Sequence, residues 1–326
     1  MKKIKWGIIG PGSIATAFAH SIKHCQNSEL IGVFGRNEEK TLVFAKSFDI
    51  QSFQSLQQFL SASDIDAIYV ATPHSDHFTY ALEAIKSKKH VLCEKPLTMN
   101  AHESMILLDL AQSLEVFLME AYMYRIHPQT LNILNNLHLL TEANETILIE
   151  GSFGFKAEVP AHHRLRNPFL GGGAILDVGC YPLSMSKLIA GHLQGLPFAE
   201  PQSISATGRI DNTGVDLQSD ACLIFSENIE AKISCAIDEE LSNQLVISSG
   251  GVSITVSQPW HCGQFQGGQS SITVVHESGL AEEISCDDQL GLFTREIEHA
   301  SSCILDGKLE SNLISHADTQ SNMFWL

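Results

Sequence analysis

The sequence is poor in positive charge, and this narrows the classes of partner. It carries 20 Lys and Arg residues against 37 Asp and Glu residues, for a formal net charge of −17. A chain of that charge without a dense basic run is repelled by polyphosphate backbones and by anionic lipid surfaces. No segment approaches the roughly 18 consecutive apolar residues of a membrane span. We therefore expect neither nucleic acid nor a membrane as a partner.

Clustered cysteines are also missing. None of the eight cysteines belongs to a CxxC pair, and most stand in apolar runs. This scatter predicts reduced, buried thiols rather than disulfides or a zinc cage. The apolar run after Lys2 and Lys3 is too short for the core of a signal peptide, and it leads directly into a glycine turn. We expect a cytoplasmic protein.

Short apolar runs alternate with amphipathic stretches in the first part of the chain. Five such runs are the expected strands, at residues 5–9, 30–34, 67–71, 90–93 and 116–119. Strands that are buried on both faces have this composition, and strands that alternate with helices are joined as βαβ units. We predict an α/β fold here: an N-terminal Rossmann domain with a doubly wound parallel sheet over residues 1–122.

Alternation of period two dominates the rest of the chain, which we predict to be an α+β domain over residues 123–326. From Ile229 to Asp238 apolar side chains alternate with mostly polar ones, as in a half-buried strand. Similar runs predict a largely antiparallel open sheet, with helices near 173–190 and 289–306 covering one face. We expect the other face to pair with a second copy, giving a homodimer or a higher homo-oligomer.

A glycine-rich turn follows the first predicted strand and precedes a helix. Gly10-Pro11-Gly12-Ser13-Ile14-Ala15 fits the GxGxx[GA] pattern in the context that the pattern requires. Gly10 allows the tight turn, Gly12 allows a pyrophosphate to approach the backbone, and the helix N-terminus at Ser13 and Ile14 favours an anion. We predict a dinucleotide site, against the alternative of an ordinary βα turn.

The second predicted strand ends without the carboxylate that NAD-preferring sites place on the ribose diol. The sequence reads Phe34-Gly35-Arg36-Asn37, and an arginine at this point binds a 2′-phosphate through charge-assisted hydrogen bonds. NADP(H) is therefore the predicted cofactor and NAD(H) the alternative. Arg36 as a solvated loop residue is the other interpretation, and the neighbouring acids Glu38 and Glu39 favour it.

Two histidines follow the predicted strand that ends before Thr72 and Pro73. His74 and His77 are three residues apart, but the sequence shows no partnering carboxylate or cysteine cluster, so we predict no metal site. Contact with the cofactor, together with Thr72 and Pro73, or the start of a helix are the two roles that we expect.

Four motifs in the same order resemble a known family. They are Ile68-Tyr69-Val70-Ala71-Thr72-Pro73-His74, His90-Val91-Leu92-Cys93-Glu94-Lys95-Pro96-Leu97, Met119-Glu120-Ala121-Tyr122-Met123-Tyr124-Arg125 and Gly171-Gly172-Gly173-Ala174-Ile175-Leu176-Asp177-Val178-Gly179-Cys180-Tyr181-Pro182. With them the chain resembles the group of glucose-fructose oxidoreductase, inositol dehydrogenase and MocA, in the branch of dimeric dihydrodiol dehydrogenase. The resemblance extends over almost the whole chain.

The resemblance implies that Glu94 and Lys95 lie at the cofactor, with Lys95 beside the nicotinamide, and that Asp177 and Tyr181 face it from the second domain. Hydride transfer requires a general acid/base at the substrate oxygen, and an ammonium nearby stabilises the phenolate of a tyrosine. Asp177 and Tyr181 are four residues apart and share one face of a helix. The alternatives are a surface lysine, a core tyrosine, an ordinary helix aspartate, and Lys95 itself as acid/base.

Basic side chains before the glycine run are candidates for the substrate pocket. We predict that Arg125, His162 and Arg164 contribute to it, with solvation in a loop as an equal interpretation for the last two and a tether between domains for Arg125.

The chain ends at residues 323–326 in apolar side chains, where relatives continue through a final helix. We expect a shortened final helix that packs back on the Rossmann domain.

These features predict an oxidoreductase that moves a hydride to or from a carbinol or carbonyl carbon of a sugar, an anhydroketose or a cyclic diol. A small polyol or carbonyl compound is thus the expected partner. Two alternatives stay open, namely a regulator that senses a dinucleotide without turnover, and a redox-neutral enzyme that keeps its cofactor tightly bound.

Overall fold

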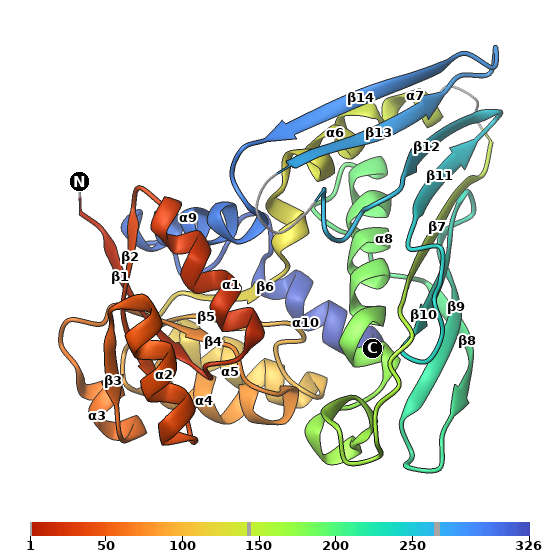
Figure 1. The fold of residues 1–326 in the computed structure, drawn as a ribbon. Helices are drawn as coiled ribbons and strands as arrows, with labels where there is room; N and C mark the ends of the chain where they lie inside the picture. The colour runs from red at the N-terminus through yellow and green to blue at the C-terminus, as the bar shows by residue number, and fades with distance from the viewer. Residues whose placement is uncertain (1, 142–144, 264–267) are drawn as a thin grey trace. The chain divides into compact units, whose positions relative to one another are not determined.

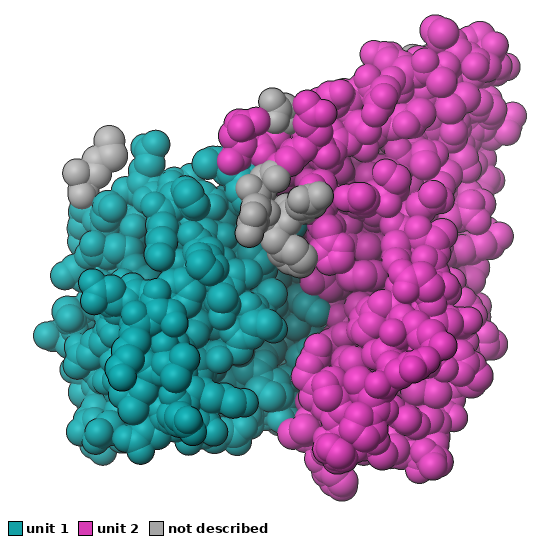
Figure 2. Space-filling view, viewed as in Figure 1, with its two compact units in different colours: residues 1–123, 290–325 teal, residues 124–289, 326 magenta. Residues whose placement is uncertain are grey.

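The computed structural model describes residues 2–141, 145–263 and 268–326, and the chain forms two compact units (Figure 2). Unit 1 holds residues 1–123 and 290–325, and unit 2 holds residues 124–289 and 326. The first boundary lies next to the predicted one. The second unit is shorter than the predicted domain, because residues 290–325 return to unit 1.

Unit 1 is built on six parallel strands in the order β3-β2-β1-β4-β5-β6 (Figure 1). The strands are β1 (Ile4–Ile9), β2 (Ser28–Phe34), β3 (Gln51–Phe53), β4 (Ala67–Val70), β5 (His90–Glu94) and β6 (Leu118–Ala121). The predicted doubly wound parallel sheet is confirmed. The order reverses between β1 and β4, and ligands of such sheets bind at the carboxyl ends of the strands beside this switch point.

Helices cover both faces of this sheet. They are α1 (Ser13–Ser21), η1 (Ile22–His24), α2 (Glu38–Phe48), α3 (Leu56–Ser61), α4 (His74–Lys86), α5 (Ala101–Ser113), α9 (Leu292–Leu305) and α10 (His316–Trp325). Asn37, Ser55 and Asn100 cap α2, α3 and α5, because the side chain of each accepts a hydrogen bond from a backbone N–H in the first turn. On one face, apolar side chains of α3, α4 and α5 pack against β4 and β5 in a continuous core.

Helix α9 corrects one expectation. The helix predicted near 289–306 was to cover the second sheet, but α9 packs on α1, β1 and β2 of unit 1. Its buried side includes Phe293 and Ile297, and Ser301 accepts a hydrogen bond of 2.9 Å from the indole N–H of Trp6. These groups find apolar and polar partners on the Rossmann sheet, which explains where the helix lies. Helix α10 also joins unit 1, where it packs on α5 and β6.

Unit 2 is built on an eight-stranded sheet in the order β14-β13-β12-β11-β7-β10-β9-β8. The strands are β7 (Ile147–Gly154), β8 (Ser203–Ile210), β9 (Asp216–Ser226), β10 (Ile229–Ala236), β11 (Leu245–Ser249), β12 (Val252–Val256), β13 (Gly268–Val275) and β14 (Ala281–Asp288). Strands β7 and β10 are parallel and the other neighbours antiparallel, so the predicted largely antiparallel sheet is confirmed.

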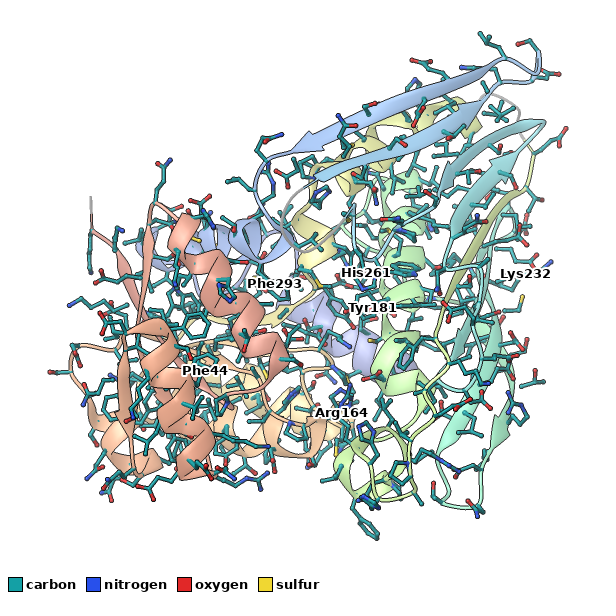
Figure 3. The ribbon with its side chains drawn as sticks, viewed as in Figure 1. Phe44, Arg164, Tyr181, Lys232, His261 and Phe293 are labelled. Atoms are coloured by element: carbon teal, nitrogen blue, oxygen red, sulfur yellow. The ribbon has the colours of Figure 1, made fainter. Side chains whose placement is uncertain are left out.

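The helices of unit 2 gather on one face of this sheet (Figure 1). They are η2 (Met123–Ile126), α6 (Pro128–Asn136), α7 (His138–Thr141), η3 (Arg164–Arg166), η4 (Pro168–Leu170), η5 (Ile175–Gly179) and α8 (Cys180–Leu193). On β10 the alternating residues Ile229, Ala231 and Cys235 are buried, whereas Lys232 points away from α8 (Figure 3). All eight residues of β8 are exposed. Pairing of the open face with a second copy stays a prediction.

The structure describes two features that were considered from the composition, the cysteines and the length of apolar segments. Seven of the eight cysteines are buried, Cys222 is partly exposed, and they form no disulfide with one another. Within the described ranges, the helices are all too short or too polar to cross a membrane.

Candidate functional site

The phosphate turn connects β1 to α1 in the predicted conformation. Gly10 has φ of +97°, and a Cβ there would lie 2.7 Å from the carbonyl oxygen of Ala71, so a side chain is excluded. Gly12 precedes α1 in extended conformation and faces open space. No side chain of the described residues caps α1, and its first turn holds no acid. Backbone N–H groups of Ser13 and Ile14 thus begin a helix suited to an anion.

Arg36 follows β2 and reaches toward the first turn of α4. Its Nη2 donates to Asp76 Oδ2 at 2.7 Å, and its side chain is 67% exposed. The guanidinium keeps further donors for a second anion, since only one nitrogen serves this contact. Asp76 was missed by sequence analysis. Its place between two singled-out histidines was the available signal, but nothing in the sequence paired it with Arg36.

Thr72 lies at the carboxyl end of β4 beside this turn. Its Oγ1 is buried and has no hydrogen-bond partner among the described residues, while its Cγ2 would lie 2.9 Å from a Cβ on Gly10. An orphaned hydroxyl beside a glycine cradle is the kind of group that a bound polar ligand satisfies. Pro73 precedes α4 in extended conformation. These residues fit the predicted dinucleotide.

The two predicted histidines begin α4 and are both buried. His74 is 8% exposed and His77 0% exposed, with ring centroids 5.6 Å apart. His77 places Nδ1 at 2.8 Å from the carbonyl oxygen of Pro96 and Nε2 at 2.9 Å from that of Thr72. Both nitrogens of His77 are thus engaged by the backbone. The described residues contain no group of three His, Cys, Asp or Glu side chains that would hold a metal ion.

Glu94 and Lys95 end β5 and begin a turn over the carboxyl edge of the sheet. The hydroxyl of Tyr69 donates to Glu94 Oε1. Burial raises the pKa of Glu94, and the hydrogen bond from Tyr69 and the ammonium of Lys95 act in the opposite direction. Burial, and then the Glu94 carboxylate, raise the pKa of Tyr69, so its hydroxyl keeps its proton and donates. Tyr69 was not predicted as a site residue, although it stands in one of the four motifs.

In unit 2, Asp177 lies in the π-helical segment η5, directly before α8. It is 6% exposed and accepts a hydrogen bond of 2.8 Å from Arg164 Nη1. The structure thus joins two residues that were predicted separately. This segment differs from the expected α-helix, because the backbone hydrogen bonds of a π-helix join residues five apart rather than four apart. One shared face for Asp177 and Tyr181 therefore no longer follows from their spacing and stays a prediction.

Tyr181 is held in a cluster of aromatic rings at the start of α8 (labelled with Arg164 in Figure 3). Its ring stacks on Tyr124 with centroids 5.5 Å apart and meets Phe153 and Trp260 edge-on at 5.1 and 6.0 Å. The Tyr124 hydroxyl donates to the backbone carbonyl of Tyr181 at 3.2 Å. Packing on this scale fixes the ring orientation.

The other predicted substrate residues have different surroundings. Arg125 is 3% exposed, and its Nη1 donates to Ser184 Oγ of α8 at 2.8 Å. His162 lies exposed in the loop before η3, and His163 caps η3 by accepting from the Leu165 N–H. Arg125 and Arg164 thus have defined partners within unit 2, and a role of any of these residues toward substrate stays a prediction.

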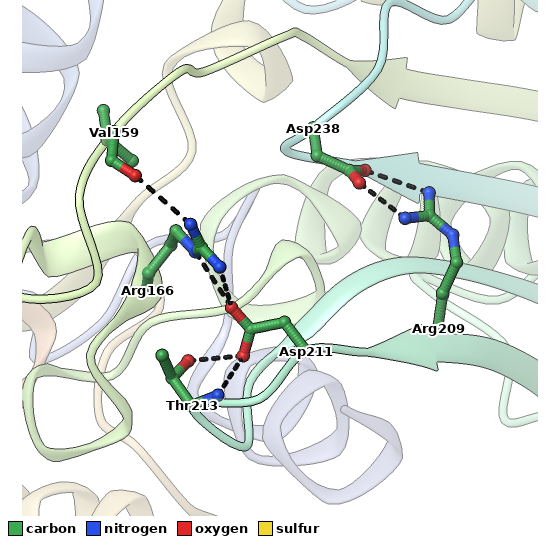
Figure 4. A network of polar contacts seen from close by, with 6 residues as sticks. All are labelled: Val159, Arg166, Arg209, Asp211, Thr213 and Asp238. Carbon is green, nitrogen blue, oxygen red and sulfur yellow. Dashed lines mark hydrogen bonds and ion pairs between the residues drawn. The ribbon is translucent and has the colours of Figure 1, made fainter.

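Arg166 holds the loop that carries Arg164 (Figure 4). Its Nη2 donates to Asp211 Oδ2 at 2.6 Å, and Thr213 N donates to Asp211 Oδ1 at 2.6 Å. Burial raises the pKa of Asp211, but the hydrogen bonds from Thr213 and Arg166 outweigh this effect and lower the pKa to about 2. Arg209 and Asp238 form a separate pair at 2.5 Å.

Asp216 explains the third glycine of the run before η5. Gly173 has φ of +119°, and a Cβ there would lie 2.1 Å from Asp216 Oδ1. Asp216 Oδ2 accepts a hydrogen bond of 2.7 Å from the Ile175 N–H and so caps the segment that carries Asp177. Sequence analysis missed Asp216. The glycine run signalled a close backbone approach, but not which residue approaches.

Comparison with known proteins finds relatives of both units. The sequence profile of the oxidoreductase family with an NAD-binding Rossmann fold, GFO_IDH_MocA, matches residues 4–122. A trans-1,2-dihydrobenzene-1,2-diol dehydrogenase of Xenopus laevis is 31% identical over 322 residues, which cover 97% of this chain and 94% of that protein. The chain belongs to the Gfo/Idh/MocA oxidoreductase family. The resemblance seen in the four sequence motifs is thereby confirmed.

A further relative and two solved structures extend the comparison. The D-xylose 1-dehydrogenase (NADP(+)) of Hypocrea jecorina is 27% identical, and the match covers 94% of this chain and 86% of that protein. The 3-ketoreductase KijD10 from Actinomadura kijaniata, solved with NADP and TDP-benzene, has a TM-score of 0.86 at 21% identity, covering 99% of this chain and 95% of that one. The aldose-aldose oxidoreductase from Caulobacter crescentus has a TM-score of 0.85 at 21% identity, with the same coverage. These structures show the shared fold.

Proposed function

We propose that this member of the family binds NADP(H) on unit 1 and transfers a hydride to or from a carbinol or carbonyl carbon of a sugar, an anhydroketose or a cyclic diol. The observation that carries the proposal is the turn of Glu94 and Lys95 at the carboxyl end of β5, next to β4 and the switch point, where Tyr69 and His77 hold the residues around Lys95. Relatives named as diol and xylose dehydrogenases support the substrate class.

The residues of unit 1 suit each part of the cofactor. Gly10, Gly12 and the N-terminus of α1 take the pyrophosphate, Thr72 Oγ1 gains a partner, and Arg36 addresses a 2′-phosphate. When bound, NADP(H) supplies or accepts the hydride. The chain supplies the proton chemistry, because the substrate oxygen must lose or gain a proton in the same reaction.

Arg36 provides a test of cofactor choice. We expect Arg36→Ala to weaken NADPH binding by about 10- to 100-fold, the effect of losing hydrogen bonds to a charged group. NADH lacks the 2′-phosphate, so its dissociation constant should change less than about threefold. Titration of nicotinamide fluorescence gives both constants. Equal dissociation constants of NADPH and NADH for the wild-type protein would refute the preference.

Lys95, Tyr181 and Asp177 are the proposed catalytic set. In the proposed mechanism, the Tyr181 phenolate accepts the proton of the substrate hydroxyl during oxidation, and the Tyr181 hydroxyl returns a proton to the substrate oxygen during reduction. The Lys95 ammonium stabilises the phenolate. Asp177 orients the substrate with Arg164, to which it is hydrogen bonded. Burial of Tyr181 and Asp177 to 5% and 6% exposure supports well-defined positions for both groups.

Removal of the Tyr181 hydroxyl tests its role. We expect Tyr181→Phe to lower turnover by about 100-fold or more, because the general acid/base is lost. The rings of Tyr124, Phe153 and Trp260 still pack on the phenylalanine, so the midpoint of thermal unfolding should change little. Phe153→Leu is a control that disturbs the cluster and keeps the hydroxyl. Full turnover in Tyr181→Phe would eliminate this assignment.

The substrate class is tested by an absorbance screen for NADP(+) reduction with aldoses, anhydro sugars and cyclic diols, and by the reverse screen with NADPH and ketoses. We expect turnover with at least one of these compounds. Tight NADPH binding without turnover on any of them would favour a dinucleotide-sensing regulator instead.

A further inference from the structure

The turn that carries Lys95 is anchored on both sides by buried side chains of unit 1. Glu120 Oε1 of β6 accepts from the Leu97 N–H at 2.9 Å, and Tyr69 of β4 donates to Glu94. His77 of α4 contacts the carbonyl oxygen of Pro96 at 2.8 Å. Three different elements therefore hold the residues immediately around Lys95.

Among these anchors, His77 also contacts a second loop. Its Nε2 lies 2.9 Å from the carbonyl oxygen of Thr72, and the ring is 0% exposed. Carbonyl oxygens only accept hydrogen bonds, so the imidazole donates to one of them when neutral and to both when protonated. Burial lowers the pKa of His77, and the ammonium of Lys95 lowers it further against the effect of the two carbonyls. The ring therefore contacts both carbonyl oxygens and donates a hydrogen bond to at least one of them.

The two carbonyls belong to segments with different tasks. Thr72 stands beside Gly10 of the phosphate turn, where its buried Oγ1 has no partner in the described part of the chain. Pro96 directly follows Lys95. The ring of His77 thus lies between two segments. One is the loop of Thr72 and Pro73 after β4, called here the cofactor loop, and the other is the turn of residues 94–97 that carries Lys95. A shift of either segment therefore requires movement of the other.

We propose that His77 is a positioning residue that fixes the Lys95 turn against the cofactor loop, and that it acts on the reaction through Lys95 rather than by touching cofactor or substrate. This inference rests on the proposed function, because it takes Lys95 as the group to be positioned. It differs from one of the two roles that the sequence led us to expect, contact with the cofactor, whereas the other, the start of a helix, agrees with the position of His77 in the first turn of α4.

Two amide variants separate the two contacts. The side-chain nitrogen of asparagine lies where Nδ1 does, and that of glutamine where Nε2 does, so His77→Asn retains a donor toward Pro96 and His77→Gln a donor toward Thr72. We expect His77→Gln to lower kcat about tenfold with an NADPH dissociation constant within about twofold, and His77→Asn to weaken NADPH about tenfold with little loss of kcat. His77→Phe should lose both. His102→Gln, at an exposed position on α5, is the matched control.

A double-mutant cycle tests action through Lys95. In a Lys95→Met background, adding His77→Gln should lower kcat by less than about twofold, because the group it positions is gone. The same loss in both backgrounds, unchanged kcat and affinity in all three His77 variants, or loss of the folded state in both amide variants would overturn the inference. If Lys95→Met itself keeps full turnover, it is the proposed function that fails, and the single His77 variants then report only on cofactor binding.

Discussion

Lys95→Met lowers turnover by about 100-fold or more if the ammonium supports proton transfer at the substrate oxygen. Methionine retains most of the length and apolar volume of the lysine side chain, so the variant removes charge rather than packing. The turn should keep its form, because the contacts of Tyr69, His77 and Glu120 go to residues 94, 96 and 97. We therefore expect the loss in kcat, with an NADPH dissociation constant within about threefold of wild type.

Steady-state kinetics on the best substrate of the screen, together with NADPH titration, make this measurement. Lys86→Met is the matched control, since Lys86 is exposed on α4 of the same unit and forms an ion pair with Glu83 at 3.0 Å. An exposed pair of this kind contributes little. If Lys95→Met turned over at the wild-type rate, the lysine would be a structural residue and the assignment of the catalytic set would be wrong.

Much of the fold could be predicted because its strands carry a pattern that burial imposes. Central strands such as β4, whose four residues are all buried, are wholly apolar, and β10 alternates as a half-buried strand does. Strands that lack such burial escaped prediction. Strand β8 is exposed at every residue and β3 has only three residues, so neither shows a period or an apolar run. The assignment of α9 also failed, because amphipathicity shows that a face is buried but not which sheet buries it.

The site was predictable where a motif fixes the backbone and not where contacts join distant residues. Gly10 was identified because a positive φ and a close approach to Ala71 require glycine. The anchors of the Lys95 turn, on β4, α4 and β6, lie 19 to 25 positions from the residues they contact, and only the assembled sheet brings them together. The ion pair of Arg36 with Asp76, 40 residues away, was missed for the same reason.

A second large effect, on the pH dependence of stability, is expected at Glu296. This residue of α9 has a carboxyl side chain and is 0% exposed. Neither of its carboxyl oxygens has a hydrogen-bond partner among the described residues. Burial, and then the charge of Glu94, raise the pKa of Glu296 well above its usual value. Two neighbouring buried carboxyls do not both ionise, and Glu94 has Tyr69 and Lys95 to stabilise its charge. Glu296 therefore folds in its protonated form.

The sign of the pH dependence follows from proton linkage. Because the folded state keeps the Glu296 proton above the unfolded-state pKa of about 4.3, it binds more protons than the unfolded state. The contribution of Glu296 to the free energy of unfolding is thus fully present below that value. It falls by about 1.4 kcal/mol for each pH unit, until the pH reaches the folded-state pKa. Glu296→Gln keeps the shape of the neutral acid and cannot ionise, so its stability lacks this slope.

Urea unfolding of both proteins at pH 5, 6, 7 and 8, followed by tryptophan fluorescence, measures the difference. Trp6, which α9 covers, and Trp325 report on unit 1, and the variants are made in a Trp260→Phe background to remove the signal of unit 2. We expect the stability of Glu296→Gln relative to wild type to rise with pH, by up to about 1.4 kcal/mol per pH unit for as long as Glu296 keeps its proton in the fold. Asp109→Asn, an exposed acid on α5, controls for the loss of one charge and should show no such slope. A constant difference between Glu296→Gln and wild type at all four pH values would mean that Glu296 is ionised in the fold, with its charge met by groups such as internal water.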